Sequence, residues 1–132
     1  MHETPSRRSL RKLTRALGRL DEALAEPEDN PLVIDGTIQR FEFVFELFWK
    51  TLRRFLAEEG VTATTPREVL QAAFAAGWIG DEAAWLAMLE ARNETSHTYD
   101  EARARDVYTS IRQHFPELAH AHRFLVDRVG AG

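Results

Sequence analysis

A short polar run at the beginning of the last third of the chain carries the side chains that could do chemistry. Arg92, Asn93, His97 and Tyr99 place a permanent cation, an amide, an imidazole and a phenol within eight residues. Imidazole titrates closest to neutrality and can move protons, and guanidinium offers a charged fork to an anionic oxygen. A helix that becomes wholly polar at its end usually faces water, a partner or a ligand. The run is therefore the candidate site.

The spacing within this run limits how one helix could present it. Asn93 and His97 are four apart and share a face, whereas Arg92 and His97 diverge by roughly 140 degrees on a continuous helix. Either the helix loosens near Ser96, or two copies pair across a two-fold axis so that each Arg meets the other's His. The plainer interpretation is that these residues only finish a helix, whose dipole favours cations at that end by up to about 1 kcal/mol.

Two carboxylates and a group of imidazoles are further candidates. Glu42 and Glu46 share one face of an expected helix, where they either form a solvated edge or accept hydrogen bonds from Arg92. The rarity of buried carboxylates favours the solvated edge. His114, His120 and His122 lie near Glu117, but no two of these imidazoles are four residues apart and the chain has no Cys. We expect no metal and no cofactor.

Length and composition indicate one helical domain. The chain has 132 residues, enough for a single core, and is rich in Ala, Leu, Glu and Arg. We predict an all-α fold with one domain over 1–132 and an ordered core over about 8–128. The absence of Cys excludes disulfides and thiolate chemistry and fits a reducing compartment. No apolar stretch reaches membrane-spanning length, so we expect a cytoplasmic protein without a membrane partner.

The charge is acidic overall but basic locally. A net charge of −4 argues against a broad, non-specific nucleic-acid footprint. The first segment nevertheless gathers six cations. Such a run is usually a solvated face, and the alternative is a surface for RNA or an anionic partner. The six are Arg7, Arg8, Arg11, Lys12, Arg15 and Arg19.

Apolar spacing predicts four long helices and one short one, joined as an up-and-down bundle. Asn30, Thr65 and Asp81 are expected helix caps, Glu68 completes a capping box with Thr65, and Pro116 should kink or restart the last helix. The expected helices cover about 8–26, 31–59, 66–76, a stretch from Asp81 into the polar run, and 103–128.

The helix expected over 31–59 is apolar on more than one side. One seam alternates spacings of four and three, as in a coiled-coil-like bundle, and further apolar residues widen it. Such a helix must bury more than one side, against other helices of the chain or a second copy. The seam is Ile34, Ile38, Phe41, Phe45, Phe48, Leu52 and Phe55, and the widening residues are Phe43, Val44, Leu47 and Trp49.

The pattern Arg-x4-His-x-Tyr, formed by Arg92, His97 and Tyr99, resembles that of HEPN domains that accompany a minimal nucleotidyltransferase (MNT). Residues 35–52 look like that family's second helix, and residues 66–79 look like its short third helix. Together these segments extend the resemblance over most of the chain.

The resemblance implies a HEPN-like bundle that forms a homodimer, with Arg92 and His97 of both protomers lining a shared cleft. Many members are metal-independent endoribonucleases that act as toxins on RNA. The nucleotidyltransferase partner serves as antitoxin, and Tyr99 corresponds to the tyrosine to which such partners attach AMP. A ribonuclease toxin of this kind is the first hypothesis. This branch is also described as the substrate-binding subunit of the nucleotidyltransferase, which is the second hypothesis. A helical dimer whose polar run only caps a helix is the third.

The residue types are consistent with metal-free RNA cleavage. Such cleavage needs a base for the 2′-hydroxyl proton and an acid for the leaving 5′-oxygen, a role that His97 would fill. Arg92 would meet the negative charge that grows on the phosphoryl oxygens, and Asn93 could orient His97 from one turn away. The phenol of Tyr99 normally titrates near pH 10, so it suits modification better than catalysis.

Overall fold

The computed structural model describes residues 3–95 and 100–131. His97 and Tyr99 lie outside these described residues. Within them every regular element is an α-helix, which confirms the predicted all-α class, and no helix there is long and apolar enough to cross a bilayer. The helices are α1 (Pro5–Leu24), α2 (Pro31–Glu58), α3 (Pro66–Ala75), α4 (Glu82–Glu94) and α5 (Glu101–Ala131).

Three helices begin at the caps that the sequence predicts. The side chains of Asn30, Thr65 and Asp81 each accept a backbone N–H of the first turn, at 2.9, 3.2 and 3.0 Å. Glu68 completes the capping box because its carboxylate accepts the Thr65 N–H at 3.1 Å. Each contact pairs a donor that the helix itself leaves free. The starts of α2, α3 and α4 are therefore fixed by local sequence.

Several helix ends shift by one to three residues, and the course of the last helix at Pro116 also differs from expectation. The first helix begins at Pro5, three residues earlier than predicted, because Thr4 caps it and accepts the Arg7 N–H at 3.2 Å. The last helix runs through Pro116 as one α-helix, so the predicted restart does not occur, while the alternative of a kink at this residue stays a prediction. Proline removes one backbone donor, but Ile111 and Leu118 on either side are buried and hold both turns in place.

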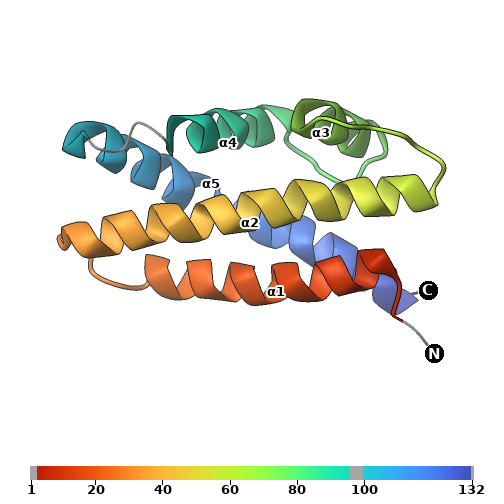
Figure 1. The fold of residues 1–132 in the computed structure, drawn as a ribbon, viewed down its shortest axis with the longest axis horizontal. Helices are drawn as coiled ribbons and strands as arrows, with labels where there is room; N and C mark the ends of the chain where they lie inside the picture. Colours follow the sequence, from red (N-terminus) through yellow and green to blue (C-terminus); the bar gives the residue numbers. More distant parts are fainter. Residues whose placement is uncertain (1–2, 96–99, 132) are drawn as a thin grey trace.

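The long helix α2 lies at the centre of the bundle. Helix α1 runs alongside it, and α3 and α4 lie end to end on its other side, while α5 crosses behind and also contacts α1 and α4 (Figure 1). The last turn of α4, with the start of the polar run, therefore sits beside the first half of α2. The chain reaches α5 from there, at the opposite end of the molecule from both termini (Figure 1).

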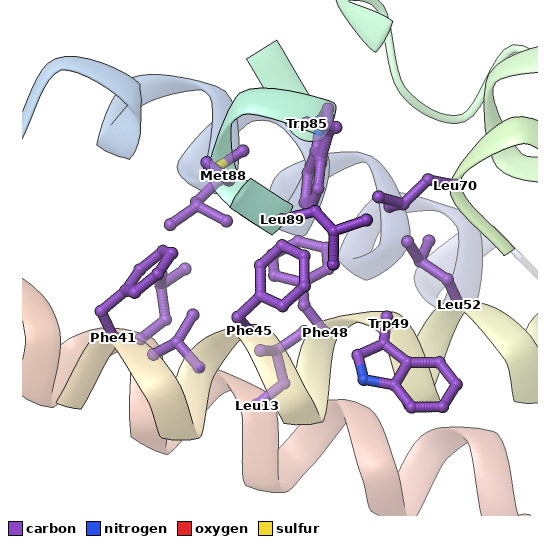
Figure 2. Close-up of a cluster of buried hydrophobic side chains, with 14 of the residues drawn as sticks. Leu13, Phe41, Phe45, Phe48, Trp49, Leu52, Leu70, Trp85, Met88 and Leu89 are labelled. Carbon is purple, nitrogen blue, oxygen red and sulfur yellow. The ribbon is translucent and has the colours of Figure 1, made fainter. Parts of the chain in front are cut away.

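The core forms where the aromatic seam of α2 meets the other helices. All seven seam residues are buried, as predicted. The Phe48 ring stands edge-on to Trp85 of α4 with centroids 4.8 Å apart, and Figure 2 shows Met88 and Leu89 of α4 beside them. The wider apolar face is only partly covered. Val44 is buried, but Phe43 is 62% exposed.

Candidate functional site

Arg92 is held at the surface by a carboxylate from another helix. It lies in the last turn of α4, and its Nη2 donates to Oε1 of Glu46 on α2 in an ion pair. The two side chains are 30% and 35% exposed. Glu46 therefore accepts from Arg92, and the expectation that both acids form a solvated edge is wrong for this residue. Glu42, one turn earlier, is exposed as that expectation requires.

The Glu46 carboxylate has further donors on its own helix. Its Oε2 accepts the indole N–H of Trp49 at 3.3 Å and lies 3.6 Å from the Lys50 ammonium. These residues follow Glu46 by three and four positions, so they share its face of α2. The carboxylate is thus fixed in place for Arg92. Sequence reasoning assigned Trp49 to the core, and it is buried, but the spacing also pointed its N–H toward Glu46.

The end of α4 brings Asn93 and Thr95 to the same place. Arg92 Nη1 donates to the Asn93 side-chain oxygen at 3.4 Å, and the Thr95 hydroxyl donates to the Arg92 carbonyl at 2.7 Å. The α-helix ends at Glu94 with Thr95 as its cap. The angle of roughly 140 degrees between Arg92 and His97 assumes one continuous α-helix through both residues, whereas α4 ends at Glu94. The relative positions of Arg92 and His97 remain predictions, since His97 lies outside the described residues.

A depression of about 630 Å³ between α4 and α5 adjoins Asn93. Its lining includes three carboxylates, Glu90, Glu94 and Asp106, against one guanidinium, Arg103. Like charges make this side unfavourable for a phosphate.

Two of the other imidazoles, His114 and His122, have structural partners. The Thr14 hydroxyl donates to the Leu10 carbonyl at 2.9 Å, so it accepts the Nε2–H of His122 at 2.7 Å. Burial lowers the pKa of His122. His114 Nδ1 lies 2.9 Å from the Ser110 carbonyl oxygen. Within residues 3–95 and 100–131, no group of three His, Cys, Asp or Glu side chains is arranged to hold a metal.

The chain matches one protein family over almost its whole length. The family described as "Nucleotidyltransferase substrate binding protein like" matches residues 8–127. A curated relative from Haemophilus influenzae, named "Probable ribonuclease HepT", is 40% identical over 84 residues. That alignment covers 60% of this chain and 58% of the relative, so the chain spans little more than half of the relative's length.

Two solved structures share the fold. A Haemophilus influenzae protein, described as revealing the fold of a substrate binding domain of a nucleotidyltransferase, superposes with a TM-score of 0.78 at 31% identity. The match covers 86% of this chain and 96% of that one. A protein from Thermus thermophilus gives a TM-score of 0.75 at 33% identity, covering 88% of this chain and 97% of that one.

Proposed function

This chain belongs to the family of nucleotidyltransferase substrate binding protein like proteins, and from that premise we propose that it is a metal-independent endoribonuclease toxin of the HEPN type. It acts as a homodimer and is neutralised by a cognate minimal nucleotidyltransferase. The observation that carries the proposal is the Arg92–Glu46 ion pair, which holds the motif guanidinium at the surface where the polar run begins. The name of the Haemophilus influenzae relative supports the reaction class.

Each residue of the motif has a distinct chemical task in this proposal. Arg92 leaves Glu46 for the scissile phosphate and meets the charge that grows on its non-bridging oxygens. His97 takes the 2′-hydroxyl proton as a base, and the resulting imidazolium gives a proton to the leaving 5′-oxygen. Asn93, which already contacts Arg92, orients the groups around the phosphate. The products are a 2′,3′-cyclic phosphate and a free 5′-hydroxyl.

Tyr99 is the regulatory residue of the proposal. The partner transfers AMP from ATP to its phenolic oxygen and releases pyrophosphate. The added group places a phosphate and a purine next to Arg92 and His97. The phosphate of this AMP repels RNA by its negative charge, and the whole group blocks the cleft sterically.

The second candidate is a binding subunit that holds substrate for the nucleotidyltransferase and has no chemistry of its own. The family description favours it, as does the net charge of −4. It predicts a stable complex with the nucleotidyltransferase and no RNA cleavage by chain free of modification. The two candidates share a partner and differ in their reaction.

The test is cleavage of RNA by purified chain whose intact mass excludes an added AMP. The unmodified chain should cleave in the presence of EDTA, and the Arg92→Ala and His97→Ala chains should lose at least about a hundredfold in rate. Equal rates for all three would show a contaminating nuclease. No cleavage by any, together with co-purification with the nucleotidyltransferase, would support the binding subunit instead.

A further inference from the structure

A groove between α1 and α2 collects cations on the face of α2 that does not meet α4. Its broad part, about 570 Å³, lies between the second half of α1 and the first half of α2. A narrower part of about 180 Å³ continues toward the start of α1, and the two share Lys12 and Leu47. The two depressions therefore adjoin each other, and we call them together the α1–α2 groove.

Every charged side chain that lines the α1–α2 groove is a cation. Helix α1 contributes four of them at spacings of four, three and four, which places them along one edge over about 16 Å. None of these four forms a salt bridge with another residue that the structure describes. They are Arg8, Lys12, Arg15 and Arg19, and α2 adds Arg40, Lys50 and Arg54.

An aromatic ring stands among these charges. Phe43 lines the broad part of the groove and is 62% exposed, although most other aromatic residues of α2 are buried. Arg40 reaches across the groove and donates to the Arg19 carbonyl at 2.6 Å, so α1 and α2 are tied together at this point. A row of cations beside an open ring is the arrangement that suits a strand of nucleotides, with phosphates on the cations and a base stacked on the ring.

We propose that the α1–α2 groove binds single-stranded RNA, with Lys12, Arg15 and Arg19 on the phosphates and Phe43 stacked on a base. The inference rests on the proposed ribonuclease function for the identity of the polyanion. A duplex is disfavoured because its base faces are already stacked and cannot cover Phe43. The groove is a binding surface and takes no part in the chemistry.

A second copy of this chain is a poor occupant of the same groove. A two-fold contact would bring the α1 cations of one protomer against those of the other, and like charges in contact are costly. A negatively charged ligand is therefore required. The chain as a whole carries a net charge of −4, yet the groove is lined by cations. A polyanion is therefore attracted to this face of the molecule.

The groove leads toward Arg92. Lys50 lines its narrow part and also pairs with Glu46, the carboxylate that holds Arg92. Only the width of α2 separates the cations of the α1–α2 groove from Arg92. A strand that occupies the groove can therefore pass over α2 and place a phosphate at Arg92.

The test is binding of fluorescein-labelled single-stranded RNA of mixed sequence to full-length His97→Ala chain, measured by anisotropy over a series of salt concentrations. Replacing Lys12, Arg15 and Arg19 together by Gln should weaken binding at least about tenfold. It should also lower the slope of log K against log salt by about two, at roughly 0.7 per phosphate contact. The matched control replaces three exposed cations elsewhere, Arg7, Arg67 and Arg123, by Gln and should bind as the parent does.

Phe43 is tested separately because its contribution does not depend on salt. Phe43→Leu should weaken binding about tenfold with the salt slope unchanged, and Phe43→Tyr should bind as the parent does, since stacking needs a π face. All replaced side chains are exposed, so circular dichroism should show unchanged melting. Equal losses for Leu and Tyr would remove the stacking claim and overturn the site as stated.

The outcomes separate the groove from the ribonuclease. If RNA binding requires the groove cations but the unmodified chain cleaves no RNA, the proposed ribonuclease function is rejected and the proposed RNA-binding groove is retained. Cleavage that persists while the groove variant binds as tightly as its control overturns the groove alone. Equal RNA binding with loss of nucleotidyltransferase co-purification would reassign the surface to that protein, and no RNA binding by the parent also rejects the proposal.

Discussion

The contact between Arg92 and Glu46 sets the resting state of the candidate site. A paired guanidinium on a partly exposed surface contributes little to stability, because solvent screens the pair and ordering two side chains costs entropy. Its value lies in position, since the pair ties Arg92, the first residue of the polar run, to α2. The Trp49 and Lys50 contacts tie the same carboxylate to its own helix, so in the proposed mechanism Glu46 stays in place when Arg92 moves to the phosphate.

Replacing Glu46 by Gln should show whether this carboxylate serves to align Arg92 or to stabilise the fold. The amide keeps the size of the side chain but not its charge, so the free energy of unfolding should fall by less than about 1 kcal/mol. RNA cleavage should slow by about tenfold or more because Arg92 is no longer aligned. Urea denaturation and single-turnover rates measure the two quantities. Glu42→Gln is the matched control, and a large stability loss with full activity would contradict the assignment.

His122 should make stability depend on pH. Burial lowers its pKa below the ordinary 6.5, so the unfolded chain binds this proton more readily than the folded chain. The contribution is fully present above pH 6.5 and is lost as pH falls through the lower folded pKa. Urea denaturation at about pH 7.5 and about pH 5.5 should show a smaller decline for His122→Gln than for the parent. His120→Gln, at an exposed position, should decline as the parent does, and equal declines for all three would exclude His122 as the cause.

At the scale of helices, the contact between α2 and α4 is the one that positions the site. Phe48 is fully buried against Trp85, and Phe48→Ala should lower the free energy of unfolding by about 3–5 kcal/mol through lost burial and a cavity. Phe74→Ala, at a residue that is 43% exposed, should cost less than about 1 kcal/mol. Chemical denaturation of both variants makes the comparison. Similar losses would mean that the two helices are held together elsewhere.

Local signals predicted most of the helices, and tertiary contacts explain the differences. Asn30, Thr65 and Asp81 cap their helices through bonds that span two or three residues, so the sequence alone indicates them. The continuity of α5 through Pro116 depends on neighbours that hold both of its halves, which no local pattern records. The start of α1 differs for another reason: Thr4 caps it locally with Pro5 at the first helical position, so the sequence carries this signal, and the buried Ser6 adds a tertiary bond by donating to Glu58 of α2 at 2.5 Å.

The site was predictable only in part for the same reason. Helical spacing placed Glu42 and Glu46 on one face, but which of them meets Arg92 depends on where α4 crosses α2. The contact joins residues 46 positions apart. The six cations of the first segment could likewise be counted from sequence, but their arrangement along a groove requires α2 as the second wall.

At the scale of the whole molecule, the surfaces have opposite charge. The α1–α2 groove is lined by cations, whereas the depression between α4 and α5 carries mostly carboxylates. A homodimer that leaves the groove open to RNA must use other faces. The predicted sharing of Arg92 and His97 between protomers would place the two-fold axis near the end of α4, on the other side of α2 from the groove.

Mixing two inactive variants tests whether the site is shared. Arg92→Ala and His97→Ala chains, denatured together in equal amounts and refolded, should form heterodimers with one intact site if each Arg works with the other protomer's His. Half of the dimers would be mixed, so cleavage should return to about a quarter of the parent rate. Each variant refolded alone is the control. No recovery, with mixed dimers detected by native mass spectrometry, would place both groups on one protomer.

The indole of Trp49 turns the site into its own optical reporter. Its N–H points at the carboxylate that neutralises Arg92, so the local field on the ring depends on whether that pair is intact. A phosphate that draws Arg92 away from Glu46 should shift the emission of this tryptophan. In a chain with Trp78→Phe and Trp85→Phe, the intrinsic fluorescence of Trp49 would then report occupancy of the site without a label, RNA cleavage or a partner protein.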